Sequence, residues 1–283
     1  MKNILALHAD LKNKTYRHSA YRHFRINDPK QRDIHKASVR DRLLHHAIYR
    51  VLYSFFSRSF ASDSHSCQNG KGTHRALKRF EKFSRTVSKN NTKQCFILKC
   101  DIRKFFATID HSTLLYIIVK YVEDRNVVWL LEKIISSFET TAGKGLPLGN
   151  LTSQLLVNIY MNEFDQFVKH KLKAKYYIRY ADDFVILHTN KDYLTNMRHG
   201  VYVALAEKLK LELHPDKVFI KTLASGVDFL GWVHFPNHRI LRTTTKRRML
   251  KKLSLSCPTA KEVKASYLGM LRWGNAYKLK LKL

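Results

Sequence analysis

The sequence predicts an α+β fold in which short apolar strands and amphipathic helices follow one another in a mixed order. Two features carry this prediction. Residues 95–100 (CFILKC) form an apolar run, and the apolar runs 175–180 and 184–187 are separated only by Ala181-Asp182-Asp183. Longer segments with apolar residues three or four positions apart stand between these runs and predict helices. A mixed order of this kind favours an α+β arrangement over a doubly wound parallel sheet.

Composition indicates a folded protein with a polyanionic partner. Of the 283 residues, 45% are hydrophobic and 12% aromatic, which is enough for a sizeable packed core. Lys and Arg number 52 against 22 Asp and Glu, a net charge of +30. A field of this size attracts nucleic acid before any specific contact forms. A general basic protein, such as one associated with the ribosome, would share this charge.

The N-terminal sequence, the lengths of the apolar runs and the cysteine pattern favour a cytoplasmic protein. The N-terminus lacks the apolar stretch of a signal peptide, and no apolar run is long enough to span a bilayer, so no membrane partner is expected. None of the four cysteines forms a CxxC pair, so a zinc site has weak support. Cys95 and Cys100 flank an apolar run and are expected to be core thiols.

The first hundred residues are expected to begin with a helical lead-in over 1–20 and a hairpin over 21–37, with its turn at Asp28-Pro29. Ser38 and Asp41 resemble a capping box at the start of a helix. One apolar face of that helix is predicted to carry Leu44, Ile48, Leu52 and Phe55. Residues 57–75 look like a polar loop, and Thr73 leads into the next helix.

The remainder alternates between helices and strands. Helices are expected over 111–138, 151–172 and about 192–210, and residues 143–149 (GKGLPLG) are expected to form a loop. Strands are expected near 217–221 and 227–235. Thr259 and Glu262 predict a capping box for a basic C-terminal helix with Val263, Tyr267 and Leu271 on one face.

Three carboxylates occupy places where charge is costly. Asp101 ends an apolar strand, and Asp182 and Asp183 lie at the tip of an apolar hairpin. Phosphoryl transfer gives a reason for them, because carboxylate oxygens suit Mg²⁺ and two Mg²⁺ ions can promote nucleotidyl transfer. Ordinary turn chemistry is the alternative for an isolated Asp-Asp pair.

The residues around these acids decide between the two readings. Tyr180-Ala181-Asp182-Asp183 resembles the YxDD box of reverse transcriptases. Other motifs of that family follow in the same order: residues 24–42 resemble the first fingers motif, 100–111 (CDIRKFFATIDH) the first palm motif, 145–154 (GLPLGNLTSQ) the loop beside the nascent base pair, and Lys217 with 229–232 (FLGW) the last palm motifs. The resemblance covers about residues 21–235.

The resemblance implies a right-hand polymerase with fingers, palm and a short helical thumb. Residues 1–100 would be the lead-in and fingers, 101–237 the palm with a fingers–palm loop around 143–154, and 238–283 a basic thumb. Its activity would be RNA-directed DNA synthesis from dNTPs on a template RNA, by way of an RNA–DNA hybrid. Two Mg²⁺ ions would be the cofactors, and Mn²⁺ could substitute for them.

Roles for the catalytic residues follow from the same resemblance. Asp101, Asp182 and Asp183 match the catalytic acids. Asp101 and Asp182 would be the direct metal ligands, with Asp183 supporting them and the Ile102 carbonyl adding an oxygen. Lys217 resembles the palm lysine near the primer end, although an exposed lysine after the Pro215-Asp216 turn is an alternative.

The nucleotide site would draw on further positions. Lys30 and Arg32 lie on the hairpin with which the family contacts the incoming triphosphate, and solvation of that hairpin is the alternative. Phe106 occupies the position of a steric gate against the ribose 2′-hydroxyl. Phe105 is adjacent, and only one of the two rings should face the site. Gln154 ends the loop motif and is assigned to the nucleotide site as well.

Leu148 departs from the LPQG form of many reverse transcriptases. Residues 149–154 (GNLTSQ) instead resemble the LGxxxSQ form of reverse transcriptases from diversity-generating retroelements, which implies copying of a template repeat RNA with errors opposite adenine. An apolar Leu148 cannot hydrogen-bond a base or sugar, and the lost contact could weaken discrimination by ~0.5–1.5 kcal/mol. Simple packing of Leu148 in the loop is the alternative.

The C-terminal segment completes the predicted nucleic-acid grip with a cluster that would contact the template–primer backbone, or form a solvated helix face: Lys246, Arg247, Arg248, Lys251 and Lys252. The retroelement resemblance also implies a small basic accessory protein and a prokaryotic or phage origin. Three readings compete with it. They are a group II intron-like reverse transcriptase, a retron or phage-defence enzyme of ordinary fidelity, and an inactive palm that binds RNA as a scaffold.

Overall fold

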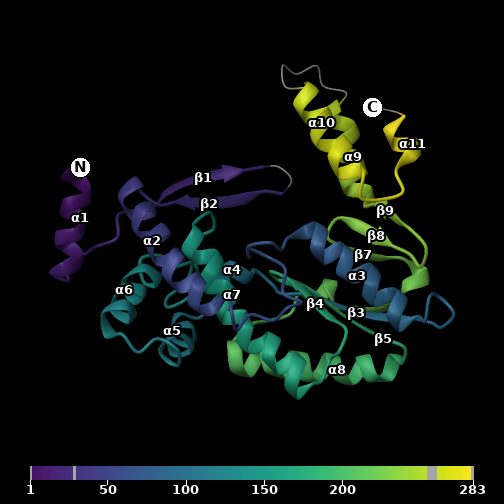
Figure 1. Cartoon of the computed structure of the whole chain (residues 1–283), viewed down its shortest axis with the longest axis horizontal. Helices are drawn as coiled ribbons and strands as arrows, with labels where there is room; N and C mark the ends of the chain where they lie inside the picture. Colours follow the sequence, from purple (N-terminus) through teal and green to yellow (C-terminus); the bar gives the residue numbers. More distant parts are fainter. Residues whose placement is uncertain (1, 28–29, 254–259, 282–283) are drawn as a thin grey trace.

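The computed structural model describes residues 2–27, 30–253 and 260–281 (Figure 1). Its strands are β1 (Arg22–Ile26), β2 (Arg32–Lys36), β3 (Phe96–Asp101), β4 (Tyr177–Tyr180), β5 (Asp183–His188), β6 (Phe219–Thr222), β7 (Val227–Phe229), β8 (Trp232–His234) and β9 (Arg239–Leu241). Its α-helices are α1 (Lys2–Lys12), α2 (Val39–Phe56), α3 (Thr73–Val87), α4 (Phe105–Thr108), α5 (His111–Val119), α6 (Arg125–Ile135), α7 (Leu151–Gln166), α8 (Lys191–Val203), α9 (Thr243–Leu253), α10 (Ala260–Leu271) and α11 (Tyr277–Lys280). Short π and 3₁₀ segments are η1 (Phe167–Lys171), η2 (Ala204–Lys208), η3 (Pro215–Lys217) and η4 (Leu223–Ser225). The expected α+β class is confirmed.

A four-stranded antiparallel sheet in the order β4-β5-β3-β6 forms the centre of the molecule. Successive side chains of a strand point to opposite faces, and both faces of this sheet are covered. Leu98 and Phe184 pack into a core shared with α2, α5 and α7. Ile97 and Val185 pack on the other face against Phe80 of α3. Burial on both faces explains why these strands read as continuous apolar runs.

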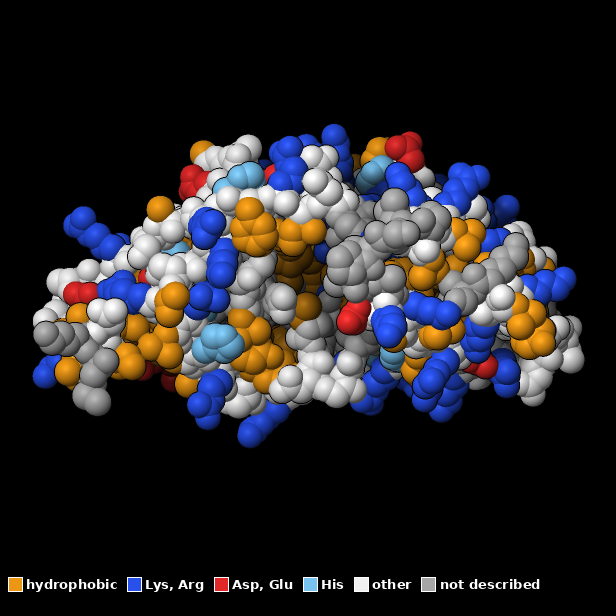
Figure 2. All heavy atoms as spheres, turned by 90° about the horizontal axis from the view of Figure 1, so that it is seen from above, with side chains coloured by type: hydrophobic (Ala, Val, Ile, Leu, Met, Phe, Trp, Pro, Cys, Tyr) orange, Lys and Arg blue, Asp and Glu red, His pale blue; other side chains and the backbone are white. Residues whose placement is uncertain are grey.

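Two smaller sheets flank the centre. The hairpin β1–β2 projects on one side of Figure 1, and the yellow helices α9 and α10 rise on the other side. The three-stranded sheet β7-β8-β9 connects the central sheet to those helices. A third hydrophobic core connects α3 to the C-terminal helices, since Leu77 of α3 is buried together with Met249 of α9 and Leu271 of α10. Figure 2 shows the surface hollowed in the middle, with hydrophobic side chains in the hollow and Lys and Arg side chains spread widely around it.

The N-terminal elements follow the sequence with one correction. Ser38 caps α2 by accepting a hydrogen bond from the Asp41 amide, as the capping pattern predicts. Phe55 was wrongly placed on the buried face: it is 53% exposed, whereas Phe56 is buried. Four-residue spacing from Leu52 leads to position 56, so the neighbouring ring completes the stripe. The predicted turn at 28–29 lies outside the described residues.

The other corrections concern where helices and strands end and where they are interrupted. The helix expected over 111–138 is two helices, because residues 120–124 break it between α5 and α6. The strand expected over 227–235 is the hairpin β7–β8, whose turn places Leu230 and Gly231 at positive φ. Lys217 lies in η3, just before β6. Cys95 and Cys100 are buried thiols as expected. The predicted cap at Thr259 lies outside the described residues.

Candidate active site

Strand pairing brings the three predicted carboxylates together. Asp101 at the end of β3 lies directly opposite Asp183 at the start of β5. Asp182 occupies the two-residue turn between β4 and β5, which the pair Tyr180 and Asp183 closes. Ala181, the other turn residue, has a φ of 56°, as tight hairpins require. Asp101 and Asp183 share a face of the sheet because their strands are in register.

Backbone hydrogen bonds fix this corner of the sheet. The Ile102 amide donates to the Asp182 carbonyl over 3.1 Å, which ties the end of β3 to the turn. The His214 amide donates to the Asp101 carbonyl over 2.7 Å. Ile102 itself is buried, so its backbone is held by packing as well. The carboxylates are thus carried by a rigid part of the fold and not by a free loop.

Two lysines meet these acids, one from η3 and one from β3. Lys217 Nζ lies 3.0 Å from Asp101 Oδ1. Lys99 Nζ lies 3.4 Å from Asp183 Oδ2 and donates to the Asp228 carbonyl over 2.7 Å. Lys99 is only 7% exposed, and the sequence analysis missed it. A lysine two residues before Asp101 in an otherwise apolar strand was the available signal, because alternation puts both side chains on one face.

Burial makes the ionised carboxylates costly. It raises the pKa of Asp183 from its ordinary value of 3.8 to about 7, and Lys99 opposes this while Asp101 and Asp182 add to it. Burial also raises the pKa of Asp182, and the charge of Asp101 adds to the increase. Lys217 and Lys30 oppose the shift at Asp182, so the fingers lysine acts electrostatically on the turn. Burial is therefore the main cause of both shifts, and the lysines offset it only in part.

The donor set suits a hard cation. Asp183 Oδ1 is buried and has no hydrogen-bond partner among the described residues, which is an expensive state for a carboxylate oxygen. Carboxylates of this kind are ligands that Mg²⁺ prefers. Within residues 2–27, 30–253 and 260–281, no group of three or more His, Cys, Asp or Glu is already arranged as a metal cluster. Lys217 and Lys99 pair with one oxygen each of Asp101 and Asp183.

A buried ion pair holds the hairpin that carries Asp182. Arg179 of β4 and Asp165 of α7 are each 1% exposed, and the guanidinium binds the carboxylate through two hydrogen bonds of 2.7 and 2.6 Å. The same guanidinium donates to the Ala181 carbonyl and to Ser64 Oγ. Tyr177 adds a hydrogen bond of 2.6 Å to Asp165. The turn is thereby anchored to the core beneath it.

The loop around 143–154 is fastened to the β1–β2 hairpin. The Leu148 carbonyl accepts from the His35 amide, and the Asn150 side chain bonds the backbone of residues 35 and 37. Gly149 has a φ of 110°, and a Cβ there would lie 2.7 Å from Ile34 Cγ2, so only glycine fits this approach. Asn150 is a second residue that the sequence analysis missed, because its role depends on this long-range docking.

The remaining predicted nucleotide-site residues differ in their exposure. Phe105 is 3% exposed and packs in the core, which leaves the partly exposed Phe106 as the ring that can face a ligand. The Phe106 carbonyl accepts from the Leu146 amide, so the backbone of this residue is tied to the loop. Gln154 is partly exposed in α7, and Arg32 is exposed at the start of β2.

The basic C-terminal cluster lies apart from the carboxylates. Figure 1 shows α9 on the opposite side of the molecule from β1–β2. All of its predicted residues fall within α9: Lys246, Arg247, Arg248, Lys251 and Lys252. No helix in the described part of the chain is both long and apolar enough to cross a membrane.

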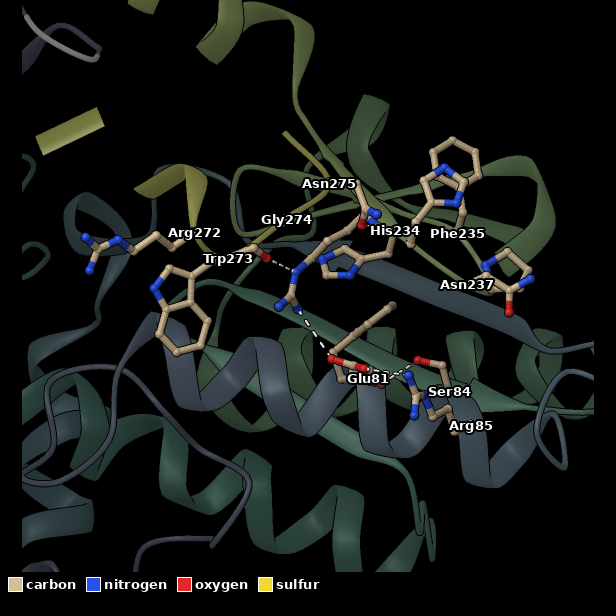
Figure 3. Close-up of a pocket in the computed structure, with 14 residues that line it drawn as sticks. Glu81, Ser84, Arg85, His234, Phe235, Asn237, Arg272, Trp273, Gly274 and Asn275 are labelled. Carbon is tan, nitrogen blue, oxygen red and sulfur yellow. Dashed lines mark hydrogen bonds and ion pairs between the residues drawn. The ribbon is translucent and has the colours of Figure 1, made fainter. Parts of the chain in front are cut away.

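One well-formed cavity lies away from this corner, at the root of α9 and α10. It measures about 260 Å³ and is lined by α3, by the turn between β8 and β9, and by residues 272–275 (Figure 3). Arg239 crosses it, donating to the Trp273 carbonyl and pairing with Glu81 at 3.8 Å. These contacts join α3 to the C-terminal segment, and none of the three carboxylates lines the cavity.

Comparison with known proteins places the chain among polymerases. The profile of the family described as reverse transcriptase (RNA-dependent DNA polymerase) matches residues 26–234. Protein YkfC of Escherichia coli is 24% identical over 77% of this chain and 65% of its own length. The group II intron-encoded protein LtrA of Lactococcus lactis is 25% identical over 87% of this chain and 51% of its own length. The chain thus spans about half to two thirds of these relatives.

Solved structures with a similar fold include telomerases. Apo telomerase from Candida tropicalis superposes with a TM-score of 0.59 at 12% identity, over 78% of this chain and 48% of the telomerase. Telomerase from Candida albicans in complex with a fragment of telomeric RNA gives a TM-score of 0.60 at 11% identity, over 92% of this chain and 54% of that one. At such identity the likeness establishes the fold alone.

Proposed function

The chain belongs to the reverse transcriptase (RNA-dependent DNA polymerase) family, and on that premise we propose that it synthesises DNA from dNTPs on an RNA template. The observation that carries the proposal is the corner where Asp101, Asp182 and Asp183 meet on paired strands. Binding RNA would not require three partly buried carboxylates, whose cost the folded protein bears. A role in catalysis explains why they are present in a chain of net charge +30.

Two Mg²⁺ ions, for which Mn²⁺ can substitute, fit the donors at this corner. Asp101 and Asp182 would hold them directly, Asp183 would support the site, and the Ile102 carbonyl would add an oxygen. When bound, the ions supply a Lewis acid for the primer 3′-hydroxyl and for the departing pyrophosphate. Lys217, which pairs with Asp101, carries positive charge to the same place.

The surrounding residues would orient the substrates. Lys30 and Arg32 would bind the triphosphate as a point charge and a planar fork, respectively. Phe106 would close the pocket against a ribose 2′-hydroxyl, and Gln154 would border the nucleotide with Leu148. The basic residues of α9 would hold the backbone of the RNA–DNA hybrid. We propose a division into fingers (1–100), palm (101–237) and thumb (238–283).

Primer extension on a defined RNA template with Mg²⁺ and dNTPs tests the activity. Asp182→Asn is expected to abolish DNA synthesis, because it removes a proposed metal ligand, while RNA binding persists. Asp216→Asn, at an exposed aspartate in η3, serves as the matched control and is expected to extend the primer normally. Equal synthesis by Asp182→Asn and wild type would contradict the catalytic assignment. A scaffold that only binds RNA would give no synthesis with either protein under any template or accessory condition.

We further propose that the enzyme is error-prone opposite adenine, as in diversity-generating retroelements. Support comes from Leu148, which is partly exposed in the loop around 143–154. Its apolar side chain cannot hydrogen-bond a base or sugar. One matched relative, LtrA of Lactococcus lactis, is a group II intron-encoded protein, and it favours a second candidate, a group II intron-like enzyme of ordinary fidelity.

Sequencing of extension products decides between the two candidates. Leu148→Gln is expected to reduce misincorporation opposite template adenine by up to roughly tenfold, because the amide restores a hydrogen-bonding group. Errors that are rare in wild type, or unchanged in Leu148→Gln, would remove Leu148 as their cause. The proposed partners are a template RNA and a small basic accessory protein, whose charge would require bound RNA to screen it from this chain.

A further inference from the structure

The exposed face of α3 carries a continuous row of positive charge that the polymerase assignment does not use. Its members follow one another three or four residues apart, which places them on one side of the helix, and all are exposed: Arg75, Lys78, Lys82, Arg85 and Lys89, the last just beyond the helix end. We call this row the basic ridge. At 1.5 Å per residue it extends about 20 Å. The opposite face of α3 is buried against the central sheet.

The acids beside the ridge are already neutralised. Glu81 pairs with Arg85 at 2.9 Å and with Arg239 at 3.8 Å. Asp63 is only 2% exposed and pairs with Arg79 at 2.6 Å and Lys169 at 3.1 Å. Glu81 and Asp63 therefore do not cancel the charges of Lys78 and Lys82, and these charges are available to a ligand.

Two hollows follow the ridge. One of about 280 Å³ is bounded by Arg75, Lys78 and Lys82 and includes His65, whose pKa burial lowers to about 4, so that it is neutral at pH 7. A shallower one of about 560 Å³ continues past Lys82 to Lys89. The first hollow lies between α3 and residues 62–65, so a backbone phosphate could settle between two segments there, whereas the second is an open groove along α3 itself.

The ridge begins beside the catalytic corner. Thr73 at the start of α3 donates to the Tyr180 hydroxyl over 3.2 Å, and Tyr180 precedes the turn that carries Asp182. An aromatic stack lies along the way, with His74 on Trp273 at 3.9 Å between ring centroids and Lys78 Nζ 5.4 Å from that indole. Cationic grooves next to aromatic rings are typical of surfaces that follow a nucleic-acid strand.

We propose that the basic ridge binds the sugar–phosphate backbone of the template RNA where the RNA extends beyond the corner that carries Asp101, Asp182 and Asp183. The identity of the strand rests on the proposed function, since the template is the nucleic acid that continues past the site of synthesis. An acidic protein fits less well, because the ridge face presents charged and polar side chains without the apolar centre of a protein interface. Contacts to the backbone would add affinity for the RNA without reading its sequence.

Equilibrium binding tests the ridge independently of catalysis. The ridge variant is Lys78→Gln/Lys82→Gln/Lys89→Gln, which leaves Arg85 to hold Glu81. A variant that removes equal charge elsewhere serves as the matched control: Lys12→Gln/Lys133→Gln/Lys191→Gln, all at exposed positions. The probes are a blunt RNA–DNA hybrid and the same hybrid with a long single-stranded RNA extension at either end. Affinity is measured over a series of salt concentrations.

The ridge variant is expected to bind the extended hybrid roughly tenfold more weakly than the control variant does, and the salt-dependence slope should fall by about 2 to 3, at about 0.7 to 0.9 per lost phosphate contact. Its affinity for the blunt hybrid should match that of the control. Equal loss in both variants, or equal loss for both probes, would overturn the proposal, because it would reduce the ridge to general attraction. Binding does not require synthesis, so an inactive enzyme would contradict the proposed function and leave this measurement intact.

Discussion

Replacement of Asp183 by asparagine should make the metal-free protein more stable at pH 8 while it impairs synthesis. Asp183 Oδ1 has no partner among the described residues, and burial raises the pKa of this carboxyl from 3.8 to about 7. The difference corresponds to about 4 kcal/mol at most, at about 1.4 kcal/mol per pH unit. The side chain keeps 18% of its exposure, so hydration will reduce the measured gain. Asparagine is neutral and avoids the cost of burying the charge.

The gain must depend on pH in a defined direction. The folded-state pKa lies above the unfolded value, so the folded protein binds the proton more tightly between pH about 4 and about 7. Stability of wild type is therefore lost as pH rises through that window. Asparagine does not titrate. The advantage of Asp183→Asn should be near zero below pH about 4 and reach its full value above pH about 7.

Urea unfolding of both proteins in EDTA at several pH values measures this advantage. Asp216→Asn, at an exposed position, is the matched control and should change stability little at any pH. Addition of Mg²⁺ at pH 8 should stabilise wild type more than Asp183→Asn, because binding to the folded state offsets the buried charge. A variant that is no more stable than wild type at pH 8, or whose advantage does not shrink as the pH falls, would refute the assignment of Asp183 as a destabilising buried carboxylate.

Two further predictions concern groups around the acids. Asp165→Leu or Arg179→Met alone should lower the free energy of unfolding by about 3–5 kcal/mol, and Asp165→Leu/Arg179→Met by less than the sum, because neither charge then remains buried alone; additive losses in urea unfolding would argue against a coupled pair. Phe106→Ala should raise incorporation of ribonucleotides relative to deoxyribonucleotides by roughly tenfold or more, measured by single-nucleotide extension. Phe105→Ala, the control in the core, should cost about 3–5 kcal/mol of stability and leave sugar selectivity unchanged; the reverse result would exchange the roles of the two rings.

The local pattern of the sequence was sufficient for most elements and for the three acids. Asp101 ends the apolar strand β3, Asp182 lies in the two-residue turn after β4, and Asp183 begins β5. A short stretch of chain therefore specifies each position. The α2 cap at Ser38 was predictable for the same reason. Element ends were less certain, since Phe55 and Phe56 both fit an apolar stripe and only packing selects one of them.

Only the tertiary structure decided which charges meet. Lys99 reaches Asp183 because β3 and β5 pair in one particular register, and Arg179 reaches Asp165 because α7 packs under β4. The spacing of residues along the chain determines neither the strand register nor the packing of the helix. Asn150 binds β2 from a segment more than a hundred residues away in sequence. Long-range contacts depend on how whole elements fit together, so the sequence determined the three candidate acids, and the fold determined the partners that hold them.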